Sequence, residues 1–508
     1  MLKHNLIANY LGQIWNILMR LALIPLYIHY IGIESYGLIG LFGVILAGLN
    51  LFDMGMTPTL SREMARFTAG EHTPESLRDL LRSIEIITFG IASLIAVTLI
   101  LSSQWLASSW LQSKNLPVSV VAQAFTIMGV VAALRFAETI YRSSIAGLQR
   151  QVLLNVVSIA LATFQGLGAV AILAWFSPTI QAFFIWQGLT SIAALVILSV
   201  TIYRLLPKGN RPARFSLPVL RSIWSYAGGM MGITFLSLLL TQVDKILLSR
   251  LLTLTDYAYY TLAATVAGSL MTLVGPITQA WFPRLSQLFV SQDFPTLIRT
   301  YHEGAQLVTV VMGSAALVLI FFSQTFLQLW TQNSELAQHT SPLLSLLVLG
   351  NLLNGLMWIP YQTQLAYGWT SLTMRMNIVA VSLIVPAILF LTPRYGAVGA
   401  AWAWVSLNAG YVLIGVHFMY RRILKTEKGR WYCQDLLYPL LSSLAVVSII
   451  RWLLPFPLSW LSQLGTLALA SFCSLCATSL GANKVRERAK MFFSRLFSTL
   501  TVKYFGEK

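Results

Sequence analysis

Charged residues are scarce in this chain, because Asp, Glu, Lys and Arg make up only 10% of its 508 residues. An average soluble domain is about 25% charged. Cysteine is scarce as well, and three cysteines exclude a small disulfide-stapled scaffold. The sequence contains neither a GxxxxGK[ST] phosphate loop nor an HExxH metal motif. It therefore predicts no built-in nucleotide motor and no metal site.

Apolar residues are abundant instead: 56% of the chain is hydrophobic, and its mean hydropathy is +0.71. The formal net charge is +17, from 34 basic and 17 acidic residues. A soluble nucleic-acid-binding protein of this charge would carry far more charged residues on its surface. The composition therefore predicts a polytopic membrane protein and no nucleic-acid partner.

Hydropathy predicts an all-α fold of about 14 transmembrane helices, because roughly 20 apolar residues cross a bilayer. The expected spans are 8–31, 37–60, 84–103, 118–141, 153–174, 180–203, 223–248, 257–280, 304–323, 341–366, 376–392, 397–420, 436–453 and 459–480. The connections are too short to hold a soluble catalytic domain. We therefore expect no extramembrane catalytic domain, and no catalytic residues are assigned.

The loop charges predict the orientation of the chain. With a cytoplasmic N-terminus, 27 of the 34 lysines and arginines fall in loops on the cytoplasmic side and four on the outer side. Cytoplasmic loops carry an excess of Lys and Arg. We therefore expect a multi-pass membrane protein with both termini in the cytoplasm.

A weak internal repeat with an offset near 221 residues predicts two related halves. Three pairs of segments match in sequence: Tyr36-Gly37 with Tyr257-Ala258, Arg62 and Phe67 with Arg284 and Phe289, and Gly147 and Asn155 with Gly368 and Asn377. Six spans is an even number, so both halves enter the membrane from the same side, as in parallel transporter repeats. The predicted parts are a six-helix bundle (1–203), a basic cytoplasmic linker (204–222), a second six-helix bundle (223–420), two extra transmembrane helices (421–480) and a basic cytoplasmic tail (481–508). We expect the two bundles to surround a central cavity.

Ionisable groups inside the spans are candidate functional residues, because each is costly in a membrane unless paired or hydrated. Gln13, Asn16 and Arg20 share one face of the first span. Arg20 suits a diphosphate or an acidic sugar, since guanidinium binds phosphate oxygens bidentately. The alternative is an ion pair between helices. Arg135 and Glu138 in the fourth span can pair along the helix, and they line the substrate path or serve structure only.

Three acidic residues, Glu138, Asp244 and Asp53, are candidates for ion coupling or gating. Asp244, with Lys245 beside it, either holds a coupling ion or forms an outer gate pair. Asp53 either has the same role or lies in the headgroup region. In the tenth span, Asn354 and Trp358 share one face, where an amide and an aromatic ring suit a sugar. The alternative is hydrogen bonding between helices.

Three segments of the sequence carry a family resemblance: IPLYIHYIGIESYGLIGL followed by LFDMGMTPTLSREMARF, TQVDKILLSRLLTLTDYAYYTLAATVAG followed by AWFPRLSQL, and LAYGWTSLTMRMNIV followed by RYGAVGAAWAWVSLNAGYV. They resemble Wzx-type polysaccharide flippases of the multidrug/oligosaccharidyl-lipid/polysaccharide exporter superfamily. Ala258 departs from the commonest pattern, in which the second repeat carries glycine.

The resemblance implies export of a polyprenyl-diphosphate-linked oligosaccharide across the bacterial inner membrane by alternating access, for O-antigen and related surface polysaccharide. It implies no cofactor, with Na⁺ or H⁺ as candidate coupling ions. The implied partners are the lipid-linked glycan, membrane lipids and polysaccharide polymerase or chain-length machinery. The alternatives are a lipid II flippase or a cation-coupled multidrug antiporter of the same fold. A membrane glycosyltransferase is disfavoured, since it would need sizeable loops.

Overall fold

A computed structural model describes residues 2–53, 55–68, 73–207, 211–216, 235, 238–369, 371–454 and 459–487 of the chain. Its backbone contacts group the chain into two compact units, Met1–Thr261 and Leu262–Lys508. The predicted change of bundle at 204–222 stays a prediction, because much of that connection lies outside the described residues. The same holds for the predicted span 223–248, which is described and helical only at 235 and from 238 onward, and for most of the tail 481–508.

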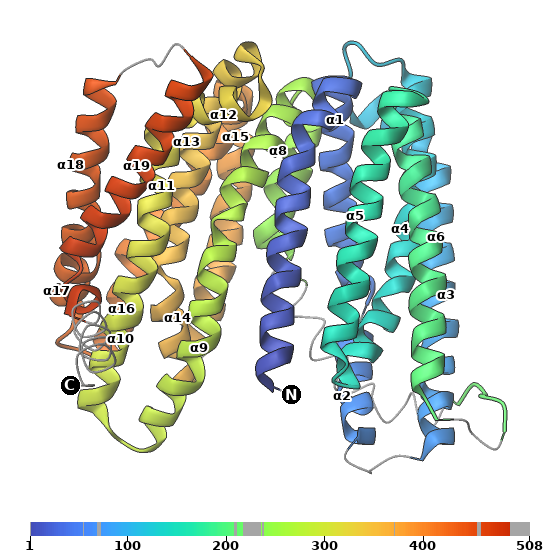
Figure 1. Ribbon diagram of the computed structural model, residues 1–508, viewed down its shortest axis with the longest axis horizontal. Coiled ribbons are helices and arrows are strands. Elements are labelled where there is room, and N and C mark those ends of the chain that lie inside the picture. Colours follow the sequence, from blue (N-terminus) through green and yellow to red (C-terminus); the bar gives the residue numbers. More distant parts are fainter. Residues whose placement is uncertain are drawn as a thin grey trace, which may run out of the picture. The chain divides into compact units, whose positions relative to one another are not determined.

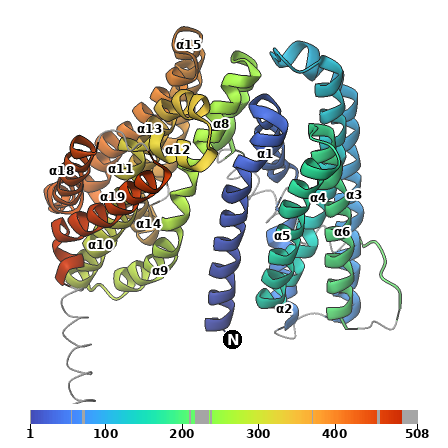
Figure 2. The ribbon, with the colours of Figure 1, turned by 45° about the horizontal axis from the view of Figure 1, so that its top comes forward.

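Unit 1 is a bundle of long helices (Figure 1). Its elements are α1 (Leu2–Phe52), α2 (Met56–Thr68), α3 (Pro74–Trp105) with the π-helical turn η1 (Leu106–Trp110), α4 (Val118–Gly147), α5 (Gln151–Trp175) and α6 (Ile180–Leu205). Helical residues 238–251 and the start of α8 (Leu254–Ser269) also belong to this unit. Within it α4 packs between α3 and α6, and α5 packs against α1 (Figure 2).

Unit 2 is also helical throughout its described part. Its elements are the end of α8, α9 (Met271–Val290), α10 (Phe294–Val308) with η2 (Thr309–Gly313), α11 (Ser314–Phe321), α12 (Ser323–Thr331), α13 (Ser334–Leu356), α14 (Trp358–Ala366), α15 (Ser371–Gly410) with η3 (Tyr411–Gly415), α16 (Val416–Arg422), α17 (Lys428–Arg430) with η4 (Trp431–Leu437), α18 (Tyr438–Leu453) and α19 (Trp460–Gly481). The predicted all-α polytopic fold class is confirmed.

Among the described residues, eleven continuous helical segments are long and apolar enough to cross a membrane. Two of them contain a glycine with non-helical torsions, Gly32 (φ 77°) in α1 and Gly396 (φ 59°) in α15. Both glycines lie where the sequence predicts a border between two spans, and glycine adopts positive φ without a steric penalty. Each of these two segments therefore accounts for two predicted spans. The second span was predicted to reach residue 60, but the helix breaks at Asp53 and α2 begins at Met56.

Polar caps set where several helices begin. Thr73 precedes α3 and accepts a hydrogen bond from the Ser76 amide, with Pro74 at the first helical position. Asn333 accepts from the Leu336 amide in the same way at the start of α13. Such caps satisfy backbone donors that a helix end leaves free.

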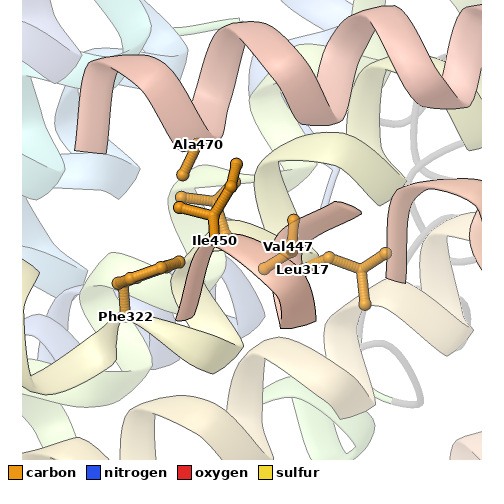
Figure 3. Close-up of a cluster of buried hydrophobic side chains, with 6 residues drawn as sticks. Leu317, Phe322, Val447, Ile450 and Ala470 are labelled. Atoms are coloured by element: carbon orange, nitrogen blue, oxygen red, sulfur yellow. The ribbon is translucent and has the colours of Figure 1, made fainter. Parts of the chain in front are cut away.

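The predicted extra helices α18 and α19 pack on the preceding part of unit 2. Leu317 and Phe322 near α11 meet Val447 of α18 and Ala470 of α19 in one buried apolar cluster (Figure 3). Apolar burial gives little association energy in lipid, so close packing of complementary side chains holds these helices together.

Gly147, the last residue of α4, allows a close helix contact within unit 1. A Cβ atom at this position would lie 2.4 Å from the carbonyl oxygen of Ser61 in α2. We expect Gly147→Ala to destabilise the protein by about 1–3 kcal/mol, because backbone must shift to admit the methyl group. The melting temperature of the detergent-purified protein measures the effect.

Gly90 supplies the matched control for this substitution. It lies inside α3, and no atom lies within 4 Å of the position a Cβ would take. Gly90→Ala should leave the melting temperature unchanged or raise it, since alanine is the better helix former. Equal behaviour of the two variants would contradict the close contact at Gly147.

Candidate functional site

A large polar cavity lies within unit 1. Its volume is about 1080 Å³, at the upper end of the roughly 300–1,000 Å³ typical of ligand pockets. Residues from α1, α4, α5 and α6, from the 46–58 segment and from 238–242 line it. Eight of the 29 lining residues are Asn or Gln, and one, Phe136, is aromatic. The wall therefore carries many groups that both donate and accept hydrogen bonds.

Amide side chains of α1 and α5 form a connected network on this wall. Asn9 Nδ2 donates to Gln151 Oε1 at 2.6 Å, and Asn155 Nδ2 donates to Asn9 Oδ1 at 2.6 Å. Gly12 leaves room for this network, because a Cβ atom at that position would lie 2.3 Å from Asn155 Oδ1. The predicted residues Gln13 and Asn16 line the same cavity.

Arg135 enters the cavity from α4. Its Nη2 donates to Gln187 Oε1 of α6 at 2.6 Å, and its guanidinium lies 5.4 Å from the centre of the Phe42 ring. A cation over an aromatic face is stabilised there. These two partners hold the charge of Arg135 at the wall of the cavity.

Glu138 and Arg142 form an ion pair one helical turn apart on α4. Arg142 Nη2 lies 3.2 Å from Glu138 Oε2, and Arg142 Nη1 donates to Ser158 Oγ of α5 at 2.8 Å. The sequence suggested a pair between Arg135 and Glu138, and the pair observed differs because Arg135 turns toward Gln187. Arg142 also lines the cavity.

Asp53 lines the cavity and caps α2. Its carboxylate accepts from the Thr57 amide at 3.1 Å and from the Thr57 hydroxyl. Burial raises the pKa of Asp53, and the bonds from Thr57 and Gly55 only partly offset this effect. A raised pKa makes Asp53 a better proton acceptor than an exposed aspartate.

Three predicted site residues of unit 1, Arg20, Asp244 and Lys245, do not line the unit 1 cavity. The Arg20 side chain is exposed and has no hydrogen-bond or ion-pair partner among the described residues. Asp244 Oδ2 accepts from the Tyr260 hydroxyl at 2.7 Å, and Lys245 Nζ lies 3.8 Å from Asp244 Oδ1. The anion-binding role of Arg20 and the coupling or gating role of Asp244 and Lys245 stay predictions.

A second, smaller pocket lies within unit 2. Its volume is about 240 Å³, and it brings the predicted residues Asn354 and Trp358 together with Tyr361 and Tyr411. Asn354 also donates to Asn408 Oδ1 of α15 at 2.8 Å. Both interpretations of this face therefore find support: it links two helices and it lines a pocket.

The polar face of α5 is not among the sites predicted from the sequence. Gln151, Asn155, Ser158 and Gln165 all line the unit 1 cavity. Their spacings of 4, 3 and 7 residues place them on one helical face, the same signal that identified the face of the first span. The same periodicity is present in the sequence and identifies these four residues of α5 as candidates.

A buried ionic cluster in unit 2 also escaped the sequence argument, and we call it the His302 cluster (His302, Gln306, Glu427 and Asp435). His302 Nδ1 contacts Asp435 Oδ2, and His302 Nε2 lies 3.0 Å from Glu427 Oε2. Gln306 Nε2 donates to Asp435 Oδ1 at 2.8 Å. Since α10 supplies His302 and the segment leading into α18 supplies the two acids, the cluster ties these elements together. Sequence separations of 125 and 133 residues left no local signal.

The comparisons with known proteins identify the family. The family model described as "Polysaccharide biosynthesis protein" matches residues 2–289. The chain belongs to this family. A second family model, MatE, matches residues 230–390. Both matched regions include segments that were quoted above for the family resemblance.

Relatives of this polysaccharide biosynthesis protein support the same placement. The chain is 21% identical over 378 residues to a Shigella flexneri protein named "Putative O-antigen transporter", covering 74% of this chain and 87% of that protein. It is similar in structure to the lipid II flippase MurJ in an inward closed conformation, with a TM-score of 0.67 at 14% identity, covering 94% and 98% of the two chains. An inward-facing multidrug resistance MATE transporter gives a TM-score of 0.60 at 14% identity, covering 81% and 96%. The likeness to these solved structures shows that the chain has the same fold, and the matching family model assigns it to the polysaccharide biosynthesis proteins.

Proposed function

We propose that this protein translocates a polyprenyl-diphosphate-linked oligosaccharide across the inner membrane by alternating access. The observation that carries the proposal is the amide-rich wall of the unit 1 cavity. Asn and Gln side chains offer donors and acceptors together, which matches the hydroxyl groups of a sugar. The volume of about 1080 Å³ suits a ligand of several sugar rings.

The charges of the cavity fit an anionic ligand better than a cationic drug. Arg135 and Arg142 line it, and the acid Glu138 is already paired with Arg142. The other acid, Asp53, has a raised pKa and binds a proton more readily than usual. No free carboxylate pair is thus left in the described cavity to hold an organic cation, while guanidinium groups bind phosphate oxygens well.

The membrane potential can drive this export without a nucleotide motor. An inside-negative potential moves an anion outward with roughly 2.3 kcal/mol per charge per 100 mV. A diphosphate diester with about two negative charges therefore gains on the order of 5 kcal/mol. Asp53 is in addition a candidate carrier of a coupling proton. The proposed orientation of the chain has both termini in the cytoplasm.

A deletion strain of the source bacterium tests the proposal. We expect it to lose long-chain surface polysaccharide, to accumulate the lipid-linked oligosaccharide on the cytoplasmic side, and to keep its resistance to cationic drugs. Polysaccharide gels and drug susceptibility measure the two properties, and the cloned gene serves as the control that restores the first.

Two other outcomes would contradict the proposal. Loss of drug resistance with intact surface polysaccharide would show a multidrug antiporter, which the structural likeness to MATE transporters allows. An arrest of cell-wall synthesis on depletion, with accumulated lipid II, would show the function for which the similar MurJ structure is named.

A further inference from the structure

The small pocket of unit 2 has the composition of a carbohydrate site. Aromatic rings of Trp358, Tyr361 and Tyr411 line it together with the amides of Asn354, Gln364 and Asn377. Flat aromatic faces pack on the apolar C–H faces of a pyranose ring, and amides bind its hydroxyl groups. The unit 1 cavity supplies amides with a single aromatic ring, so the two sites differ in kind.

Hydrogen-bonding groups in this pocket are left available. Gln364 is only 2% exposed and uses its Oε1 to accept from Thr373 at 3.0 Å, whereas its Nε2 has no partner among the described residues. Asn377 likewise uses Oδ1 for Tyr411 at 3.2 Å, and its Nδ2 has no described partner. Both amide donors belong to residues that line the pocket, so each is available to a hydroxyl oxygen of a bound ligand.

The pocket lining contains no charged residue among those the structure describes. A diphosphate or a uronic acid would find no counter-ion there, and burying an unpaired charge is unfavourable. Its volume of about 240 Å³ is below the roughly 300–1,000 Å³ typical of drug-sized ligands. One neutral sugar ring suits both the uncharged lining and the small volume of the pocket.

We propose that the Trp358 pocket of unit 2 is a subsite for one neutral pyranose of the transported glycan, separate from the unit 1 cavity. The assignment of its ligand to the transported glycan rests on the proposed function. Trp358 stacks on the sugar, while Gln364 and Asn377 donate to its hydroxyl oxygens.

Saturation-transfer-difference NMR on the purified full-length protein tests this subsite. The probes are the methyl glycosides of glucose, galactose, mannose, rhamnose and N-acetylglucosamine, with methyl glucuronide and inorganic phosphate as anionic probes. The protein is held in lipid nanodiscs prepared from a non-glycoside detergent, because a maltoside headgroup would itself compete for a sugar site.

We expect at least one neutral glycoside to receive saturation, and Trp358→Ala to reduce it about fivefold, as for the loss of one aromatic stack. Gln364→Leu should reduce it as well, and Trp358→Phe should restore part of it. Trp402→Ala is the matched control, since Trp402 is an exposed tryptophan of α15 outside the pocket. Because the unit 1 cavity is itself proposed to bind sugars, the readout is the part of the signal that Trp358→Ala removes, and Asn155→Leu should leave that part unchanged.

Several results would overturn the subsite. One is equal saturation of every neutral glycoside in wild type and Trp358→Ala, including the case of no transfer at all. Another is loss of the Trp358-dependent part of the signal in Asn155→Leu, which would show that the two pockets do not bind sugar separately. Equal, Trp358-dependent transfer to methyl glucuronide would refute the neutral class. This readout is independent of the deletion phenotype, so failure of the subsite and failure of the proposed function are distinguishable.

Discussion

Replacing His302 by leucine is expected to destabilise the protein by about 3–5 kcal/mol. The imidazole contacts Asp435 through Nδ1 and Glu427 through Nε2, and Asp435 is fully buried. Glu427 would keep Arg430 at 3.3 Å. Leucine would, however, leave the buried Asp435 with the Gln306 amide and no cation, and an uncompensated buried charge is the costly case. The melting temperature of the purified protein should fall by about 3–5 °C, as expected for a chain of this length.

A second substitution separates loss of the charge partner from loss of packing. Asp435→Asn removes one of the two negative charges, so His302→Leu should cost less in that background, with a coupling free energy above about 1 kcal/mol. His29→Leu is the matched control, because His29 is exposed and has no hydrogen-bond partner among the described residues. Equal melting temperatures for His302→Leu and His29→Leu would contradict the structural role of the His302 cluster.

Replacing Arg142 by glutamine is expected to lower surface polysaccharide at least about tenfold in the complemented deletion strain. Arg142 is the more accessible cation of the unit 1 cavity, since its side chain is 35% exposed while Ser158 and Glu138 orient it. A hydrogen bond between charged groups contributes about 1.5–3 kcal/mol, which corresponds to roughly 10- to 100-fold in affinity. Gels of the surface polysaccharide, normalised to the amount of protein in the membrane, measure the effect.

Two further variants locate the anion site. Arg142→Lys keeps the charge but loses the planar fork, so we expect an intermediate effect. Arg20→Gln is the comparison that decides between the two candidates, because Arg20 was singled out by its place in the first span and does not line the cavity. A normal polysaccharide level in Arg142→Gln together with a loss in Arg20→Gln would assign the anion to Arg20 instead.

The polar residues show how far local sequence patterns reach. The face of Gln13 and Asn16 was predicted from spacing, and the face of Gln151 and Asn155 carried the same signal. Helical periodicity places residues on a common face, because every α-helix turns by the same angle per residue. Periodicity does not predict which helix faces pack against each other. Asn9 and Asn155 lie 146 residues apart and meet only because α1 packs against α5.

By itself the sequence determined the membrane class, the all-α fold and nearly all of the spans. Each of these depends on local composition, since a helix in lipid must satisfy its own backbone hydrogen bonds within one apolar segment. Only the tertiary structure decided that Arg142 pairs with Glu138 in the cavity, that Arg20 lies outside it, and that His302 lies between two acids. These outcomes depend on how each helix is rotated and what it packs against. Contacts between distant segments fix that rotation, and the composition of a single span does not encode it.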